Sequence, residues 1–322
     1  MRIPRALSPS ALQKFEKNID QYYLTYLAEV RTQREPQSKP ASVGSAFDAF
    51  IKAELIDVFF GEKNEFESLF ESQVEEQNRD FALEAGRHIL SDYKYCGAYK
   101  DLLELMDGCE NPRFEFDGSG SVGGVPIYGK PDCCFESHGV GVVLDWKVNG
   151  YCGNSGTSPA KGYALVRDGE GWTSRNNGQS HKLYNPLSFK GFTINEYPME
   201  ETGIDWADQT TMYSWMGGCP VGQESVVMID QVVAKPGPER PLLRIAQHRA
   251  RVSSDYQLKL LARLQNMWQK VNSGQVFDDD PEINQDRVDK LNKTALSMQT
   301  DNSDLGNFFA YCSTPITFYR GR

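Results

Sequence analysis

The sequence has no apolar run that approaches the ~20 residues needed to span a bilayer. No long apolar stretch of the signal-peptide type occurs near its beginning. Its seven cysteines are odd in number and irregularly spaced, which argues against a disulfide framework. These absences predict a protein without membrane spans that resides in the reducing cytoplasm.

Two further features are missing. The phosphate-binding pattern G-x-x-x-x-G-K-[S/T] does not occur, so an ATP-driven motor would have to be a separate partner. An excess of basic residues is also absent, because 34 lysines and arginines face 44 acidic residues and give a net charge of −10. Nucleic-acid-binding proteins usually present a basic surface, so this charge argues mildly against tight, non-specific DNA binding. A net charge is a sum, however, and does not exclude a local basic groove.

What is present is an ordinary globular composition, in which 39% of the 322 residues are hydrophobic. We expect a single domain over residues 1–322. Its parts are a helical N-terminal region at 1–110, a core at 111–235, and a C-terminal helix with a tail at 236–322. The core contains an insertion at 149–188 that is rich in glycine and lacks periodicity. The aromatic and basic residues of this insertion could contact bases and phosphates. Alternatively, the segment is a surface insertion with a small core of its own.

Hydrophobic periodicity and turn signals predict the individual elements. Helices are expected at 8–30, from Ser42 or Gly44 to about Phe60, and at 73–91, 96–106, 205–215 and 254–272. Strands are expected at 113–117, 125–128, 131–135, 140–148, 190–196, 224–233 and 240–249. Residues 118–124 are rich in glycine and serine and are expected to form a turn. The acidic tail from residue 275 is expected to be loosely structured as far as 308–319.

The most informative pattern is a pair of apolar runs around a short polar loop, which predicts a β-hairpin. The first run, Pro131–Phe135, contains Asp132, and the second, Val140–Val148, contains Asp145 and Lys147. Residues two apart on a strand share a face, so the side chains of Asp145 and Lys147 leave on the same side. Pairing of the two strands can bring Asp132 beside them. The hairpin then presents two carboxylates and an amine together.

This combination suits a divalent metal site. Hard cations such as Mg²⁺ bind carboxylate oxygens, lower the pKa of a bound water, and stabilise charge on a reacting phosphate. A lysine near that water can orient it or offset negative charge. An Asp-x-Lys pair is common by itself, however, and an exposed hairpin with an ordinary ion pair is the simpler explanation of the pair taken alone.

The rest of the sequence favours the metal site, because the arrangement resembles the PD-(D/E)XK nuclease superfamily and, within it, the RecB-like exonuclease branch. Further matching stretches follow in the order of that branch: Leu7–Phe15 with Tyr22–Leu27 resembles its opening helix, Gly44–Phe50 its G-x-x-x-H motif, and Gln209–Tyr213 its Q-x-x-x-Y motif. The resemblance runs from residue 7 to about residue 235 and leaves out 150–195.

The resemblance implies a fold and a catalytic centre. The fold is α/β, a restriction-endonuclease-like core in which helices flank a central mixed β-sheet. Asp132 and Asp145 would bind Mg²⁺ or Mn²⁺, joined by the backbone carbonyl of Trp146. Lys147 would position or activate the attacking water.

Further candidates surround this centre. Gln209 and Tyr213 lie one helical turn apart and would hold the substrate strand through hydrogen bonds. Glu115, in the strand before the hairpin, is either near the metal or a simple exposed strand residue.

The sequence also departs from the family pattern. The family often has His where Asp48 stands; a carboxylate still suits Mg²⁺ or Mn²⁺ but changes the geometry of the site. Some relatives hold an iron–sulfur cluster through one Cys near the N-terminal helix and three near the C-terminus. Here Asn18 stands at the first position and only Cys312 lies near the C-terminus, so no iron–sulfur cluster is expected.

The sequence therefore predicts a metal-dependent deoxyribonuclease, of the exonuclease type, acting in DNA recombination, repair, phage DNA processing or defence. Its expected partner is single- or double-stranded DNA. A separate helicase, recombinase or annealing protein, and a second copy of the chain, are further candidate partners. The alternatives are a catalytically inactive nuclease-fold subunit that binds DNA or acts as a scaffold, and a hydrolase of small phosphoesters.

Overall fold

The computed structural model describes residues 1–149, 164–168, 171–173, 175–176, 179–180, 187–235 and 242–298, apart from residues 33, 64 and 96. The chain divides into two compact units. The larger comprises Arg5–Gln13 and Pro36–Gln269, and the smaller comprises Met1–Pro4, Lys14–Glu35 and the chain from Lys270 onward. Every candidate site residue belongs to the larger unit. Most of the expected insertion at 149–188 lies outside the described residues.

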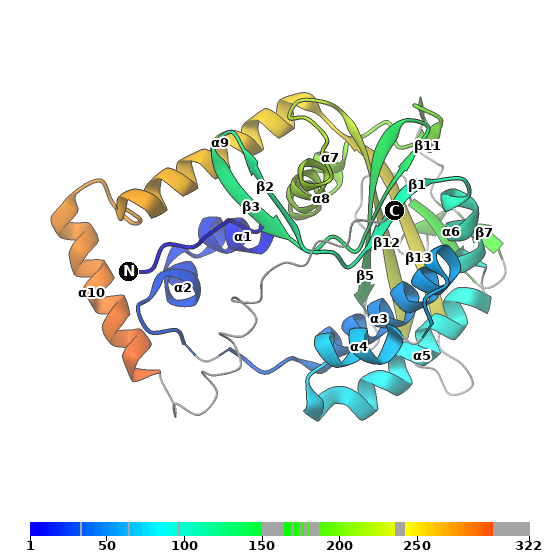
Figure 1. The fold of residues 1–322 in the computed structure, drawn as a ribbon, viewed down its shortest axis with the longest axis horizontal. Helices are drawn as coiled ribbons and strands as arrows, with labels where there is room; N and C mark the ends of the chain where they lie inside the picture. Colours follow the sequence, from blue (N-terminus) through cyan, green and yellow to red (C-terminus); the bar gives the residue numbers. More distant parts are fainter. Residues whose placement is uncertain are drawn as a thin grey trace. The chain divides into compact units, whose positions relative to one another are not determined.

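A seven-stranded mixed sheet forms the centre of the larger unit (Figure 1). Its strands, in spatial order, are β1 (Glu110–Phe114), β4 (Cys133–Ser137), β5 (Val140–Asn149), β12 (Ser225–Lys235), β13 (Leu242–Val252), β6 (Ala164–Asp168) and β7 (Gly171–Thr173). β5 and β12 are parallel, and every other neighbouring pair is antiparallel. The expected hairpin is β4–β5, in which Cys133 lies opposite Leu144.

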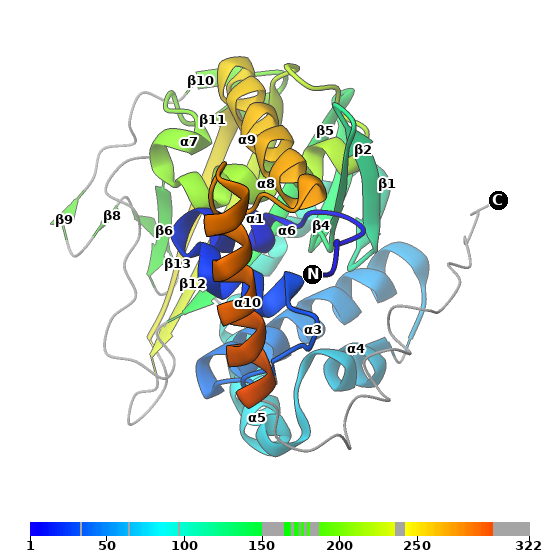
Figure 2. The same ribbon diagram turned by 90° about the vertical axis from the view of Figure 1, so that its left-hand side faces the viewer.

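Helices cover both faces of this sheet, because successive strand residues point to opposite sides. On one face, Leu144 and Trp146 pack with α3 (Lys39–Phe60) and α5 (Arg79–Tyr95). On the other face, Val143 packs with α8 (Ile204–Met216). Figures 1 and 2 show α3 and α5 on one side of the sheet and α8 on the other. The prediction of an α/β fold with helices flanking a mixed sheet is confirmed.

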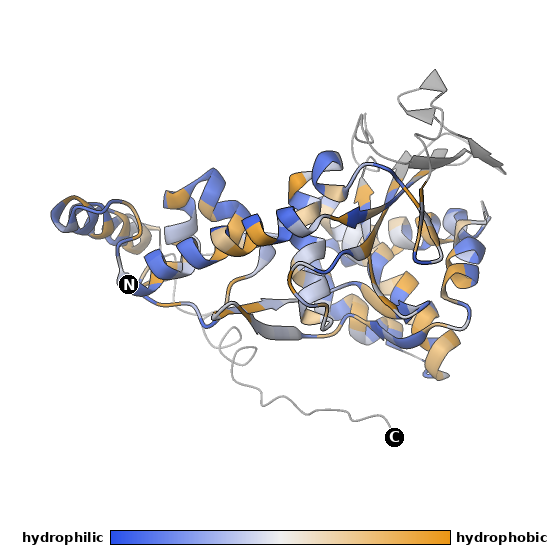
Figure 3. Cartoon of the chain, turned by 90° about the horizontal axis from the view of Figure 1, so that it is seen from above, coloured by the Kyte–Doolittle hydropathy of each residue, from blue (hydrophilic) through white to orange (hydrophobic). Residues whose placement is uncertain are grey.

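Helix α3 carries part of the candidate site and begins earlier than the sequence predicted. Its N-cap is Ser38, whose side chain accepts a hydrogen bond from the amide of Ala41, so the predicted starts at Ser42 and Gly44 are wrong. The helix ends at Gly61, which adopts the left-handed conformation with φ +70°. In Figure 3, hydrophobic and hydrophilic residues alternate along the helices, as expected for helices with one packed and one exposed face.

Two predictions between residues 60 and 130 are wrong. The remaining helices there are α4 (Glu65–Gln73), the short 3₁₀ turn Glu76–Asn78, and α6 (Ala98–Met106). The helix expected at 73–91 is broken because Gln37 and Glu75 exchange hydrogen bonds across that point. The turn expected at 118–124 is the hairpin β2 (Gly118–Val122) and β3 (Val125–Gly129). Only Gly123 and Gly124, both with positive φ, form its turn.

The other described elements of the larger unit are the short strand pair β8 (Arg175–Asn176) and β9 (Gln179–Ser180), the hairpin β10 (Leu187–Phe189) and β11 (Phe192–Ile194), and the helices α7 (Met199–Thr202) and α9 (Ser254–Ser273). Helix α9 continues from this unit into the smaller one. Helix α8 matches the helix expected at 205–215 within one residue at each end. Among the described helices, none has the length and apolarity that crossing a bilayer requires.

The smaller unit contains two departures from the sequence expectation. The helix expected at 8–30 breaks at Asn18, which caps α2 (Ile19–Tyr22) after α1 (Pro9–Lys17) ends, and a π-helical turn at Tyr23–Leu27 follows. Part of the tail expected to be loose is helix α10 (Pro281–Ser297), capped by the side chain of Asp280. Residues 308–319 lie outside the described part of the chain.

Candidate active site

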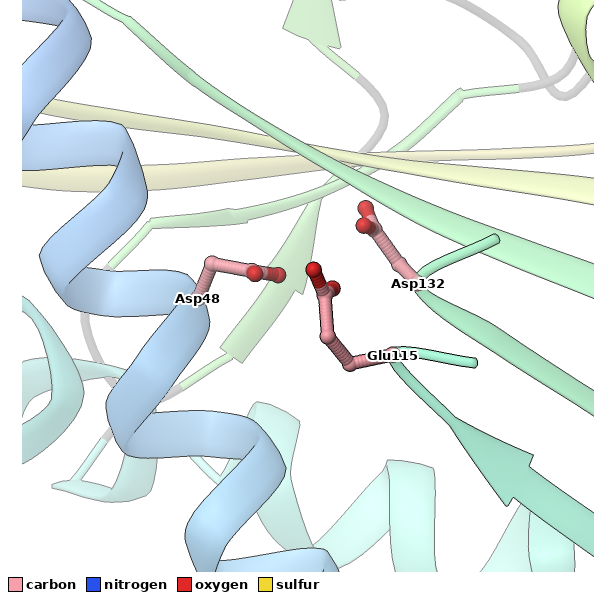
Figure 4. Close-up of side chains that lie close together, drawn as sticks. All are labelled: Asp48, Glu115 and Asp132. Carbon is pink, nitrogen blue, oxygen red and sulfur yellow. The ribbon is translucent and has the colours of Figure 1, made fainter. Parts of the chain in front are cut away.

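Three carboxylates from separate segments converge beside the sheet. Asp48 lies on α3, Glu115 directly follows β1, and Asp132 directly precedes β4; one oxygen of each lies within 4.8 Å of the others. Figure 4 shows the three side chains pointing toward one another. β1 and β4 are antiparallel neighbours in which Phe114 pairs with Cys133, so the residues just beyond that pair lie side by side. The topology of the sheet therefore creates this cluster.

The backbone at Glu115 is strained. Its φ is +43°, in the left-handed region that a residue with a Cβ rarely adopts and that costs roughly 1–2 kcal/mol. Its amide donates a hydrogen bond to the carbonyl oxygen of Asp132, with N···O 3.2 Å, which holds the bend in place. Strain of this kind is typical of positions where the surrounding structure fixes a functional side chain.

A lysine that the sequence interpretation missed lies at the centre of this cluster. Lys52 is on α3, one turn after Asp48, and its side chain is 0% exposed. Its ammonium group pairs with the carboxylates of Asp48 and Glu115 and lies 3.0 Å from Oδ1 of Asp132. The signal available in the sequence was the i, i+4 spacing from Asp48, which places both residues on the same face of the helix.

A second group of polar side chains lies on the face of the sheet covered by α8. Nζ of Lys147 is 2.5 Å from Oδ2 of Asp145, which is itself buried. Gln209 connects the group: its Oε1 accepts from Lys147 Nζ at 3.0 Å, and its Nε2 donates to Asp145 Oδ1 at 3.0 Å. The same Nε2 lies 3.1 Å from the hydroxyl oxygen of Tyr213. Each of these four side chains therefore contacts at least one other.

Helix α8 is held in place by a buried ion pair and by close packing. Asp208 is 1% exposed, and both of its oxygens accept from the guanidinium of Arg263 on α9 at 2.9 Å. On the opposite flank, Gly129 lies so close to Tyr213 that a Cβ at that position would be 2.7 Å from Cε1 of the ring. These contacts fix where Gln209 and Tyr213 meet the sheet.

Asp132 links the two groups. Its Oδ1 faces Lys52, while its Oδ2 accepts a hydrogen bond from the amide of Trp146 at 3.1 Å. On a β-strand the N–H and C=O of one residue point toward the same neighbour, so the carbonyl of Trp146 faces the same edge of β5 as Asp132. Asp145 is the residue immediately before Trp146 on β5, so its carboxylate is close to that carbonyl in the sequence.

The charges in this site alter one another's pKa values. Burial and the charge of Asp132 raise the pKa of Asp145 to about 7. Burial and the charge of Asp132 also raise the pKa of Asp48 well above its usual value. For Asp132 itself, burial acts to raise the pKa, but the ammonium groups of Lys52 and Lys147 lower it below the usual value.

For Lys52 and Lys147, burial and the neighbouring carboxylates act on the pKa in opposite directions. Desolvation alone would lower the pKa of Lys52, but the carboxylates of Asp132, Asp48 and Glu115 raise it well above its usual value. The pKa of Lys147 is raised for the same reason, mainly by Asp145. Both lysines therefore carry a positive charge at neutral pH.

The donor set fits a hard divalent cation. Its members are carboxylate oxygens and a backbone carbonyl, which Mg²⁺ and Mn²⁺ prefer over softer ligands. Oδ1 of Asp48 is buried and has no hydrogen-bond partner among the described residues, so one lone-pair site in the cluster is unsatisfied. A bound cation would also allow Asp48 and Asp145 to ionise despite their raised pKa values.

The structure thus places the site residues expected from the sequence in two adjoining groups. Asp48, Glu115 and Asp132 form the first, and Asp145, Lys147, Gln209 and Tyr213 form the second, with Trp146 joining them through its backbone. Their chemical roles remain predictions.

Comparison with solved structures gives only distant likenesses. A candidate exonuclease from Eubacterium rectale is 14% identical, with 97% of this chain and 91% of the other covered, at a TM-score of 0.38. The protein named SSO0001 is 12% identical, with 81% and 85% covered, at a TM-score of 0.25. Both TM-scores are below 0.5. No curated protein sequence matches the chain significantly.

The sequence comparison with protein families is more informative. Residues 6–161 match the model of the PD-(D/E)XK nuclease superfamily. The matched segment contains Pro131, Asp132, Asp145 and Lys147. It also includes Asp48, whereas Gln209 and Tyr213 lie beyond it. The segment that forms the carboxylate cluster and the β4–β5 hairpin is therefore similar to the PD-(D/E)XK nuclease superfamily.

Proposed function

We propose that this protein is a metal-dependent deoxyribonuclease of the RecB-like branch that hydrolyses DNA phosphodiester bonds as an exonuclease. The observation that carries the proposal is the meeting of Asp145, Lys147 and Gln209, within 3.0 Å of one another, next to Asp132. An ion pair on an exposed hairpin would not explain why Asp145 is buried and bonded to a glutamine from a distant helix.

Asp132 and Asp145 would hold Mg²⁺ or Mn²⁺ together with the carbonyl of Trp146, and Asp48 would complete the protein ligands. When bound, the ion would polarise the scissile phosphate and lower the pKa of a water molecule. Both carboxylates are fixed before the ion arrives, Asp132 by the Trp146 amide and Asp145 by Gln209. Such preorganisation means that little reorganisation is needed during reaction.

Lys147 would orient the attacking water and offset negative charge at the phosphate. Its side chain is 31% exposed, so it reaches both the buried Asp145 and the solvent side where a substrate must enter. Gln209 holds the ammonium group through its Oε1, which restricts Lys147 to one orientation. The hydroxyl of Tyr213, adjacent to Gln209, is a donor for a phosphate oxygen of the substrate strand.

The partners follow from the same proposal. DNA, single- or double-stranded, is the substrate, in recombination, repair, phage DNA processing or defence within the cytoplasm. A separate helicase, recombinase or annealing protein would supply unwinding or strand exchange, and a second copy of the chain would form a homo-oligomer. The resemblance to the RecB-like branch supports these assignments.

The test is the variant Lys147→Ala, assayed on end-labelled linear, nicked circular and single-stranded DNA with Mg²⁺, with Mn²⁺ and with chelator. We expect loss of cleavage by about 10²-fold or more with the fold retained, because Lys147 is partly exposed and contributes to chemistry rather than to the core. Lys100→Ala, an exposed lysine of α6, is the matched control and should cleave like the parent. Undiminished digestion by Lys147→Ala would contradict the proposal.

A second candidate function is a nuclease-fold subunit that no longer cleaves and serves as a DNA-binding or scaffolding protein. One observation favours it: the ammonium group of Lys52 already lies among the carboxylates of Asp48, Glu115 and Asp132. Titration of the protein with Mn²⁺ separates the two candidates, since a chain that binds no Mn²⁺ at this site is the scaffold.

A further inference from the structure

We propose that Lys52 is a built-in cation that takes the place of a second metal ion, so that this site holds one divalent ion, on the side of Asp132 and Asp145. This inference rests on the proposed metal-dependent function. It concerns the number of ions that the site accepts, and no feature of the family pattern assigns a role to Lys52.

The position of the ammonium group is the first support. Three carboxylates whose oxygens lie within 4.8 Å of one another form a cradle of the size and chemistry that a divalent cation occupies. Lys52 contacts all three, and its side chain is fully buried. A surface lysine can turn toward water, but this one has no exposed surface through which to leave the cradle. The cradle therefore already holds a cation that belongs to the protein itself.

The charge balance is the second support. Asp48, Glu115, Asp132 and Asp145 bring four negative charges when ionised, and Lys52 and Lys147 bring two positive charges. The remaining charge of −2 is neutralised by one Mg²⁺ or Mn²⁺. A second divalent ion would leave the buried cluster with a charge of +2, which is as unfavourable in a poorly solvated site as the charge of −2 without any ion. Without the charge of Lys52 the cluster carries −3, so one ion no longer neutralises it, and a second ion changes the net charge only from −1 to +1.

The arrangement of Asp132 shows which side remains open for the ion. Its Oδ1 is engaged by Lys52, and its other oxygen faces β5, where Asp145 and the carbonyl of Trp146 lie. Lys52 contacts Oδ1 of Asp132, and Glu115 contacts Lys52. The ion is thus expected between Asp132 and Asp145, and Glu115 serves as a partner of Lys52 rather than as a metal ligand.

The experiment counts bound Mn²⁺ on the full-length chain by isothermal titration calorimetry and by the electron paramagnetic resonance of free Mn²⁺. The parent is expected to bind one ion per chain at this site. Lys52→Met removes the charge but keeps the length of the side chain, and it is expected to bind two. The double variant Lys52→Met with Glu115→Gln restores the charge of −2 and is expected to return to one ion.

Two controls accompany the count. Lys94→Met removes a lysine that pairs with Glu54 at the surface, and it should leave both the ion count and the melting temperature in chelator unchanged. In chelator, Lys52→Met should melt several degrees below the parent, and Mn²⁺ should reverse this loss. If Lys52→Met folds only in the presence of Mn²⁺, ions are counted on protein refolded with Mn²⁺. Lys52→Arg, which keeps the charge, should bind one ion.

The outcomes separate this inference from the proposed function. A parent chain that binds two ions overturns the role of Lys52 and leaves the metal-dependent nuclease intact. A Lys52→Met variant that binds a single ion more tightly shows that the lysine competes for the same position, which also overturns it. A parent chain that binds no Mn²⁺ contradicts the proposed function itself.

Discussion

At the scale of single residues, Gln209 connects the side chains from which chemistry is expected. It donates to Asp145 and accepts from Lys147, so one side chain from α8 holds both of them. We predict that Gln209→Leu lowers kcat by about 10–100-fold, as is common when the group that orients a metal ligand is removed. The fold should be retained, because leucine also fits a helix. Steady-state assays and a melting curve measure both effects, and an unchanged kcat would show that Gln209 has no orienting role.

His248 is a buried residue with an acid-sensitive contribution to stability. It lies opposite Ile229 in the sheet, 5.2 Å from the ring of Trp206, and neither of its ring nitrogens has a hydrogen-bond partner among the described residues. Burial lowers its pKa to about 4, below the value of ~6.5 in an unfolded chain. Between these values the unfolded state binds more protons, so folding stability falls as the pH decreases from ~6.5 toward 4.

The prediction for His248 follows from that sign. Relative to His248→Leu, the parent should lose about 2 kcal/mol of unfolding free energy between pH 7.5 and pH 5. Urea denaturation of both proteins at the two pH values measures the difference, and the comparison removes the contribution of other groups such as Asp145. A gap that stays constant with pH would show that His248 is not buried as a neutral ring.

At the scale of elements, the close approach of α5 to α3 fixes the position of Asp48 and Lys52. A Cβ at Gly86 would lie 2.7 Å from Cβ of Ala46, so a larger residue forces the two helices apart. We predict that Gly86→Ala destabilises the fold by about 1–3 kcal/mol, although alanine has the higher helix propensity. It should also weaken Mn²⁺ binding. Ser91→Ala, on the exposed side of α5, is the control, and equal stability of the two variants would contradict the prediction.

The elements also show which predictions a sequence can support. Strands β5 and β12 and helix α8 were predicted nearly in full, because each has a strong local pattern of apolar residues. Helix α10 was missed because its many polar and charged residues hide the small apolar stripe of Val288, Leu291 and Ala295. The break between α4 and α5 was missed because it depends on a hydrogen bond to Gln37, far away in the sequence.

The same distinction applies to the site. Asp132, Asp145 and Lys147 were found because one hairpin brings them together, and a hairpin is a local structure. Lys52 was missed because a lysine on a helix is usually a surface residue, and the carboxylates of Asp48, Glu115 and Asp132 together make its burial favourable. Glu115 and Asp132 come from two other segments, so the i, i+4 spacing from Asp48 does not by itself reveal the role of Lys52.

At the scale of the whole molecule, the charge of −10 opposes the approach of a polyanion, and the carboxylate cluster adds to this repulsion. We predict that DNA binding itself requires the divalent ion. The Lys147→Ala variant, which should not cleave, should bind a single-stranded oligonucleotide at least about tenfold more tightly in Mg²⁺ than in chelator. Fluorescence anisotropy at matched ionic strength measures this, since salt alone weakens binding. Equal affinities would show that a basic surface elsewhere carries the interaction.

The parallel pairing of β5 with β12 determines where the chain tolerates changes in length. Two parallel neighbours cannot be joined by a tight turn, so the chain must return through a long crossover, here residues 150–224. The entropy of closing such a connection grows slowly, by about 0.6 kcal/mol for each doubling of its length. The connections between the elements of this crossover can therefore be lengthened or shortened while the hairpin that carries Asp132 and Asp145 keeps its register. Under the proposed function, we expect changes in the crossover to alter which DNA ends are accepted without disturbing the residues proposed to cut them.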